Sequence, residues 1–225
     1  MGWLAPAHHD ELLAQWQALG AQLACAGEDW QRAGRRLIRS WARWPRRYHN
    51  TPHLLACLRH FESVRERVRN PQAVALALWF HDAIYWPWSG HNEQRSADWA
   101  QAFLSRMKLD QALIDEVVAL IMTTRHQAVP APGDAQWVVD IDLAILGQRA
   151  EVYRQFELDV RSEYRWIRWS RYTERRAAVL GGFLARERIY STPWFGERLE
   201  APARQNLQAA IAALRRGQLY GDAAP

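Results

Sequence analysis

Two neighbouring side chains in an apolar stretch could do chemistry. His81 and Asp82 interrupt the run Ala77-Leu-Trp-Phe-His-Asp-Ala-Ile-Tyr85. A helix with this much apolar surface belongs in a core, and burying an imidazole beside a carboxylate is costly unless both groups are satisfied. A divalent cation satisfies both, because neutral imidazole and ionised carboxylate are metal ligands. We therefore predict a metal site that uses His81 and Asp82.

Further ligands would have to come from other helices. His53 falls in the first turn of one helix, and the apolar run Trp137–Gly147 carries two carboxylates, Asp140 and Asp142, of which one would complete the set. Mixed nitrogen and oxygen ligation suits Mn, Fe, Co, Ni or Zn better than Ca. Water at an open position of such an ion would become a nucleophile for phosphoester hydrolysis. A lone buried histidine is more often only hydrogen-bonded, so the combination carries the prediction.

The elements that must position these residues are helices. Apolar residues recur with helical period along almost the whole chain, and no stretch of the sequence alternates as a strand would. Asp10 and Thr51 are the predicted N-caps of the first and third helices, with Pro52 in the first turn of the third. Helices are predicted over residues 10–26, 29–44, 51–61, 71–85, 92–107, 110–124, 137–147, 151–169, 171–186 and 197–217. We expect an all-α, single-domain bundle over residues 1–225, with a metal-binding core at about 46–150 and C-terminal helices at 151–220 packed on it.

Composition limits the alternatives. The chain has 225 residues, 49% of them hydrophobic and 13 of them Trp, which is enough for a sizeable core. No apolar run is long enough to cross a bilayer, and the N-terminus lacks the pattern of a signal peptide, so we expect a cytoplasmic protein without membrane contact. The two cysteines, Cys25 and Cys57, have no paired spacing, so neither a disulfide framework nor a cysteine metal cluster is expected.

Basic charge is carried almost entirely by arginine. Formal net charge is +5, and 28 of the 29 basic residues are Arg. Guanidinium binds phosphate in bidentate geometry, which favours a phosphate-bearing ligand, although codon composition explains the same bias equally well. The arginines are scattered from Arg32 to Arg216 rather than gathered in a tail, so a nucleic-acid-binding arm is not indicated.

The spacing of the candidate ligands resembles that of a known family. His53, His81-Asp82 28 positions later, and a distant Asp look like the HD-domain metal-dependent phosphohydrolases. Tyr48-His-Asn-Thr-Pro-His53 is also similar to the motif that opens the catalytic domain of cyclic-nucleotide phosphodiesterases. The resemblance implies that His49 is the general acid that protonates the leaving oxygen. It also implies that His53, His81 and Asp82 are metal ligands.

More narrowly, the chain resembles an uncharacterised bacterial group of predicted HD-superfamily phosphohydrolases. In several relatives the metal-binding Asp directly precedes an apolar helix start, which favours Asp142 as the fourth ligand and leaves Asp140 as a helix N-cap. The matching stretches are Tyr48–His53, Ala77–Tyr85, Asn92-Glu-Gln-Arg-Ser-Ala97, Asp140–Gly147, Arg161-Ser-Glu-Tyr164 and Arg204-Gln-Asn-Leu207.

Other polar residues have both a functional and a structural interpretation. Glu93 is either a helix-capping acid or a general base that orients water. His126 is either a favourable partner of a helix dipole or, like Asp140, a ligand of a second metal or of substrate. Arg47, next to His49, is the preferred phosphate contact. The other candidates for that role are Arg46, Arg125, Arg161 and Tyr164, while Trp86 and Trp88 are expected to cover the core rather than to stack on a base.

These residues lead to one expected activity and two rivals. We expect a metal-dependent phosphohydrolase that uses Mn, Fe, Co, Ni, Zn or Mg to hydrolyse a small phosphoester, with a nucleotide as the leading substrate. The rivals are a non-catalytic nucleotide-binding regulator and an HD-fold di-iron oxygenase. The number of metal ions, and the choice between a monomer and a homodimer, stay open.

Overall fold

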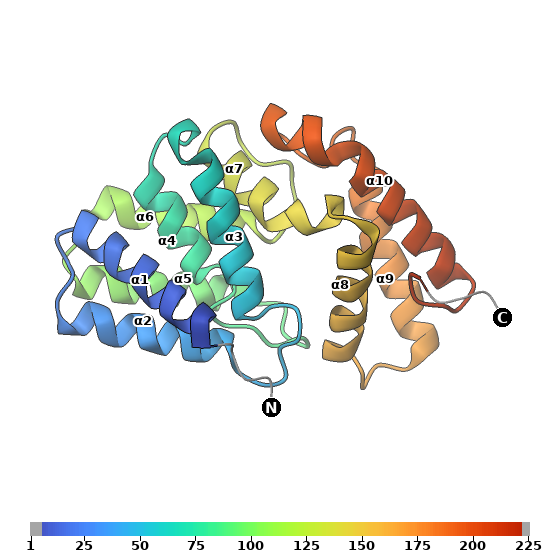
Figure 1. Ribbon diagram of the computed structural model, residues 1–225, viewed down its shortest axis with the longest axis horizontal. Helices are drawn as coiled ribbons and strands as arrows, with labels where there is room; N and C mark the ends of the chain where they lie inside the picture. Colours follow the sequence, from blue (N-terminus) through green and yellow to red (C-terminus); the bar gives the residue numbers. More distant parts are fainter. Residues whose placement is uncertain (1–5, 222–225) are drawn as a thin grey trace. The chain divides into compact units, whose positions relative to one another are not determined.

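The computed structural model describes residues 6–221, and over that range the chain is helical without strands, as predicted (Figure 1). The chain divides into two compact units, one up to Ile141 and one from Asp142 onward.

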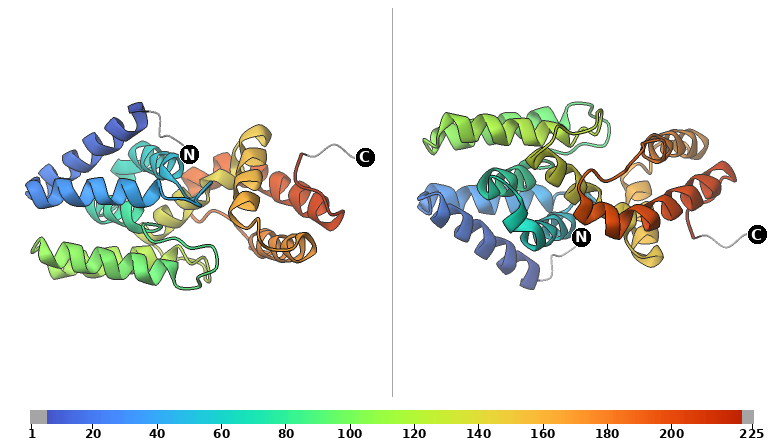
Figure 2. Two further views of the ribbon diagram at one scale, coloured as in Figure 1. Left: turned by 90° about the horizontal axis from the view of Figure 1, so that it is seen from below. Right: turned by 90° about the horizontal axis from the view of Figure 1, so that it is seen from above.

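The first unit is built around helix α4 (Pro71–Phe80), whose residues from Ala73 to Phe80 are all buried. In both views of Figure 2, α4 lies between the α1 and α2 pair and the α5 and α6 pair. An all-apolar helix is expected at such a place, because neighbours cover every face of it. The surrounding helices are α1 (Pro6–Gln22), α2 (Glu28–Trp41), α3 (Thr51–Val64), α5 (Asn92–Arg106), α6 (Gln111–Thr123) and α7 (Asp134–Asp142).

Two tryptophans lock α1 to α2. The indole rings of Trp16 and Trp30 stack with centroids 4.3 Å apart. Each indole N–H donates to the backbone carbonyl of the other residue, at 2.7 Å from Trp16 and 2.8 Å from Trp30. A glycine one helical turn after each tryptophan makes room for the opposite ring. A Cβ on Gly20 would lie 2.4 Å from the Trp30 ring, and one on Gly34 would lie 2.2 Å from the Trp16 ring.

Because of this close approach, we expect replacement of glycine by alanine to destabilise the protein at Gly34 but to stabilise it at Gly181. Alanine in a helix interior is ordinarily about 1 kcal/mol better than glycine. At Gly34 the indole cannot move without breaking its hydrogen bond, and overpacking typically costs about 1–3 kcal/mol. We expect Gly34→Ala to lower the free energy of unfolding by about 1–2 kcal/mol, measured by denaturant titration. Gly181→Ala, in a helix with nothing within 4 Å of the added Cβ, should raise it; a stabilised Gly34→Ala would contradict the packing described.

Helix α7 is fixed at its start by a buried carboxylate. The Asp134 oxygens accept the backbone N–H groups of Arg69, at 2.8 Å, and Asn70, at 2.7 Å. Asn70 is itself the N-cap of α4, where its side chain accepts the N–H of Ala73. Asp134 therefore holds the beginnings of α4 and α7 together, and both helices lead towards candidate ligands at their opposite ends.

The second unit consists of a 3₁₀ turn and three helices: η2 (Leu143–Gly147), α8 (Ala150–Glu163), α9 (Trp169–Leu184) and α10 (Pro193–Arg215). Helix α10 packs against α9 and η2. Gly147 allows this approach, since a Cβ there would lie 2.6 Å from Cβ of Leu199. The Asn206 side chain donates to the carbonyls of Leu146 and Gln148, both at 2.8 Å, and so ties α10 to the end of η2.

Three predicted helix starts are wrong. Helix α1 begins at Pro6, so Asp10 lies inside it. The N-cap of α3 is Asn50 rather than Thr51, because the Asn50 side chain accepts the N–H of His53 at 3.3 Å. Asp140 is not a helix N-cap, because α7 already begins at Asp134. Over residues 6–221 no helix combines the length and apolar composition needed to cross a membrane.

Candidate metal centre

Four side chains of the kinds that bind metal converge in the structure. His53, Cys57, His81 and Asp142 each offer a ligand atom, and these atoms all lie within 4.8 Å of one another. His53 and Cys57 are one turn apart on α3, His81 is the C-cap of α4, and Asp142 is the last residue of α7. The two histidines and the cysteine are buried, and Asp142 is half-buried.

The separations between these atoms match those around a small cation. The Nε2 atoms of His53 and His81 are 3.4 Å apart, and Sγ of Cys57 is 3.7 Å from Nε2 of His53. Tetrahedral Zn²⁺ has Zn–N bonds of about 2.0–2.1 Å and Zn–S bonds of about 2.3 Å, which place two nitrogens about 3.4 Å apart and a nitrogen and a sulfur about 3.6 Å apart. The spacing of the two histidine nitrogens therefore fits a divalent ion. The thiol of Cys57, which is also 3.8 Å from Nδ1 of His53, would have to turn towards the Nε2 side to bind the same ion.

A hydrogen bond orients one ligand. Nδ1 of His81 lies 2.9 Å from the carbonyl oxygen of Leu78. That carbonyl can only accept, so Nδ1 carries the proton and Nε2 presents its lone pair to the cluster. Metal-binding histidines are commonly held in this way by a backbone carbonyl.

Asp82 lies beside the group but is not one of its members. Its Oδ2 is 3.7 Å from Nε2 of His81. Helix α4 ends at Phe80, so His81 and Asp82 occupy the turn that follows rather than the helix interior that the sequence predicted. Of the two carboxylates of the Trp137–Gly147 run, Asp142 belongs to the group, whereas Asp140 is fully buried and does not.

His49 approaches the centre from the loop before α3. Its ring stacks on Tyr85 with centroids 4.1 Å apart, and its centroid is 6.2 Å from that of His53. The guanidinium of Arg46 donates to the carbonyls of His49 at 3.1 Å, Asp82 at 2.6 Å and Ala83 at 2.9 Å. Arg46, which the sequence offered as a phosphate contact, therefore positions the loop that carries His49. The neighbouring Arg47 is exposed.

The segment after Asp82 is held by the first turns of α5. The buried Asn92 exchanges hydrogen bonds with the backbone of Trp86, at 3.0 and 2.9 Å. The hydroxyl of Ser96, one turn later and fully buried, accepts the N–H of Ile84 at 3.0 Å. Asn92 and Ser96 thus hold the segment after Asp82 against α5. Trp86 is half-buried and covered by the guanidinium of Arg43, whereas Trp88 is exposed.

Glu93 and His126 are not part of the group of four. The Glu93 carboxylate lies 4.0 Å from Nε of Arg125, so the two side chains form an ion pair. His126 follows the C-cap of α6 with a positive φ of 55°, a conformation that non-glycine residues seldom adopt. Neither the predicted water-orienting role of Glu93 nor the second-metal role of His126 is tested by these positions.

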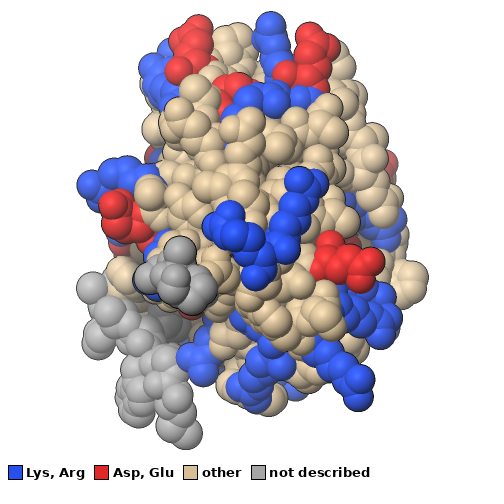
Figure 3. Space-filling model, turned by 90° about the vertical axis from the view of Figure 1, so that its right-hand side faces the viewer, with Lys and Arg blue, Asp and Glu red and all other residues tan. Residues whose placement is uncertain are grey.

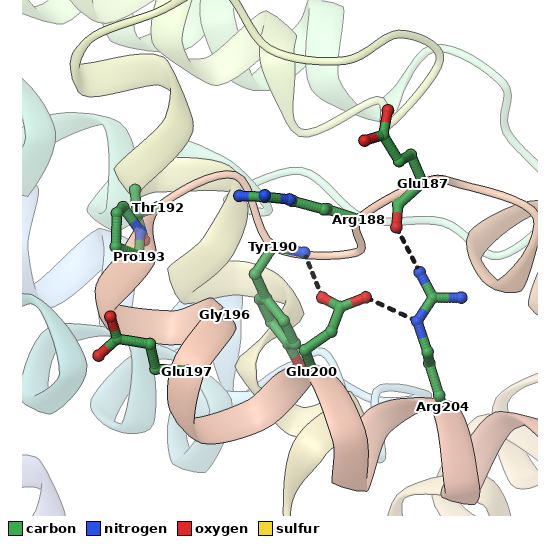
Figure 4. Close-up of a pocket in the computed structure, with 9 residues that line it drawn as sticks. All are labelled: Glu187, Arg188, Tyr190, Thr192, Pro193, Gly196, Glu197, Glu200 and Arg204. Atoms are coloured by element: carbon green, nitrogen blue, oxygen red, sulfur yellow. Dashed lines mark hydrogen bonds and ion pairs between the residues drawn. The ribbon is translucent and has the colours of Figure 1, made fainter.

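Two other stretches that carry the family resemblance, beginning at Arg161 and Arg204, form hydrogen bonds that hold backbone segments together. Arg161 donates to the carbonyls of Tyr164 at 2.8 Å and Ile167 at 3.2 Å, closing the turn between α8 and α9. In the second unit, Arg204 bonds the Glu200 carboxylate, which accepts the N–H of Tyr190 (Figure 4). Tyr190, Glu200 and Arg204 line one side of a pocket of about 450 Å³. Arg161 and Arg204 therefore each have a structural role in holding backbone.

Sequence reasoning missed Cys57. It lies four residues after His53, a spacing that places both side chains on one helix face, and this signal was available. The same face continues to the half-buried His60, where burial, with a smaller contribution from His53, lowers the pKa of the imidazole. Cysteine was weighed only as part of a disulfide framework or a cysteine cluster, so Cys57 was not considered as a single member of a mixed group.

One face of the molecule shows how its charged side chains are distributed. On the face that Figure 3 shows, Lys and Arg side chains stand in several separate places, with Asp and Glu groups between them.

Comparison with protein-family models, with curated proteins and with solved structures finds no match to this chain. The convergence of side chains is therefore the basis on which a function can be proposed.

Proposed function

We propose that the protein is a metal-dependent phosphohydrolase of the HD type. The observation that carries this proposal is the convergence of two imidazoles, 3.4 Å apart at Nε2, with the Asp142 carboxylate. His53, His81 and Asp142 would hold a divalent ion, with Asp82 close enough to join them. When bound, such an ion polarises a phosphoryl oxygen and activates water.

His49 is the residue that we assign to proton transfer. General acids work best when their pKa lies near the operating pH, as that of histidine does. The His49 ring is outside the group of four, yet its centroid is only 6.2 Å from that of His53. A protonated His49 would donate its proton to the ester oxygen as the bond from that oxygen to phosphorus breaks. Tyr85 and Arg46 hold it ready for this role.

The proposed substrate is a small phosphoester, with a nucleotide favoured by the resemblance. Arg47 is two residues from His49 and exposed, so its guanidinium can meet a phosphate that arrives from solvent. The aromatic segment after Asp82, with the exposed Trp88, offers an apolar surface for the rest of such a molecule.

Metal content and phosphate release, measured together, test the proposal. We expect purified protein to hold about one divalent ion per chain, as tetrahedral sites with protein ligands do, and to release phosphate from nucleotides or an aryl phosphodiester only when loaded. His81→Ala should lose both properties. His91→Ala is the matched control, because His91 is an exposed residue at the start of α5. Stable metal binding without hydrolysis of any phosphoester would favour the regulator or the oxygenase.

A further inference from the structure

We propose that the thiolate of Cys57 is a direct metal ligand, and that this sulfur makes the centre select zinc-like ions over magnesium and manganese. The inference rests on the metal site of the proposed function but not on phosphate hydrolysis. It departs from the all-nitrogen-and-oxygen set that the sequence predicted. Sulfur ligands favour Zn²⁺ and related ions, whereas Mg²⁺ and Mn²⁺ prefer oxygen.

Geometry supports sulfur as a ligand. Sγ of Cys57 lies within 4.8 Å of the ligand atoms of His53, His81 and Asp142. It is 3.7 Å from Nε2 and 3.8 Å from Nδ1 of His53, so the thiol would turn towards the two Nε2 atoms when it binds an ion there. Because His53 and Cys57 are four residues apart on α3, the helix itself sets this pair at a fixed separation.

Burial points the same way. Cys57 is 1% exposed. The other cysteine, Cys25, is half-buried and belongs to no such group. On binding, the ion would replace the thiol proton of Cys57, which passes to solvent, so one S–H bond breaks as one metal–sulfur bond forms.

Cobalt provides a direct test, because thiolate bound to Co²⁺ gives an intense near-ultraviolet charge-transfer band that nitrogen and oxygen ligands do not. We expect the band on titrating wild type and Cys25→Ser with Co²⁺, and its loss in Cys57→Ser. The Zn²⁺ affinity of Cys57→Ser should fall by more than about 100-fold, the upper end of the loss seen on removing an outer-shell partner. Cys25→Ser should bind Zn²⁺ as wild type does.

A second measurement needs no variant. In wild type, Zn²⁺ should slow the alkylation of Cys57 relative to Cys25 under mild denaturant, as read by mass spectrometry of peptides, whereas Mg²⁺ should not. A charge-transfer band that persists in Cys57→Ser, or an unchanged Zn²⁺ affinity there, would overturn the inference. The two proposals can fail separately. If the metal-loaded protein releases phosphate but shows no charge-transfer band, the sulfur ligand is contradicted and the hydrolase stands. If the band appears but no phosphate is released, the hydrolase is contradicted and the sulfur ligand stands.

Discussion

Replacing Glu157 with alanine is expected to lower the free energy of unfolding by about 3–5 kcal/mol, the usual cost of leaving a buried charge without its partner. The Glu157 side chain is 1% exposed and that of Arg176 is 13% exposed. Nε and Nη2 of Arg176 donate to the two carboxylate oxygens at 3.2 and 2.7 Å. Burial alone lowers the pKa of Arg176, but the Glu157 charge outweighs it and holds that pKa above its ordinary value. A guanidinium is effectively always protonated in proteins, so Arg176 would stay charged and lack its partner when Glu157 is removed.

The chain offers a control with the same geometry at the surface. Nε and Nη2 of Arg59 donate to Glu11 at 3.2 and 2.8 Å, but the Arg59 side chain is 61% exposed. Because exposed pairs are worth roughly 0–1 kcal/mol, Glu11→Ala should lower the free energy of unfolding by less than about 1 kcal/mol. Replacing Glu157 and Arg176 together by methionine should restore most of the loss, since no charge remains buried. Denaturant titration followed by circular dichroism checks all three, and equal losses in Glu11→Ala and Glu157→Ala would contradict the account.

His49→Gln is expected to reduce kcat by about 100- to 10,000-fold on alkyl phosphoesters, the usual contribution of a general acid. The ring stacks on Tyr85 outside the group of four, so its loss should leave the metal content unchanged. Esters with an acidic leaving group, such as nitrophenyl phosphates, need little help from a proton donor. Their hydrolysis should fall far less.

The dependence on the leaving group separates this role from a structural one. A variant that only disturbed the loop would slow both kinds of ester alike. The descending limb of the pH–rate profile, which reports the loss of the general acid's proton, should also disappear in His49→Gln. An equal loss on alkyl and aryl esters would contradict the assignment of His49, although it would leave the metal centre standing.

Helices were predicted well from the sequence, because the apolar residues of most of them recur with a clear period, and α4 is apolar on every face. Boundaries were less accurate. The sequence placed the N-cap of the third helix at Thr51, but Asn50 makes the capping bond. It also extended the fourth helix past His81, whereas α4 ends at Phe80. Propensity alone cannot choose between adjacent residues that can both cap a helix.

The candidate site was only partly accessible from sequence. His53 and His81 were found because buried polar residues stand out in apolar runs. Cys57 did not stand out, since cysteine is an ordinary core residue. The carbonyl partners of Arg46 could not be foreseen, because two of them, Asp82 and Ala83, lie more than 30 positions away in the sequence. The glycines that admit Trp16 and Trp30 were invisible for the same reason, since their role is the space that they leave.

Arg46 also bears on how the site meets a substrate. Its guanidinium bonds the carbonyls of His49, Asp82 and Ala83, so residues more than 30 positions apart in the chain are ordered together. Ordering a loop residue costs roughly 1–2 kcal/mol of backbone conformational entropy. Here the loop loses this conformational entropy during folding, so ordering the loop does not reduce the free energy of ligand binding. The loop that carries His49 is therefore preorganised before any ligand arrives.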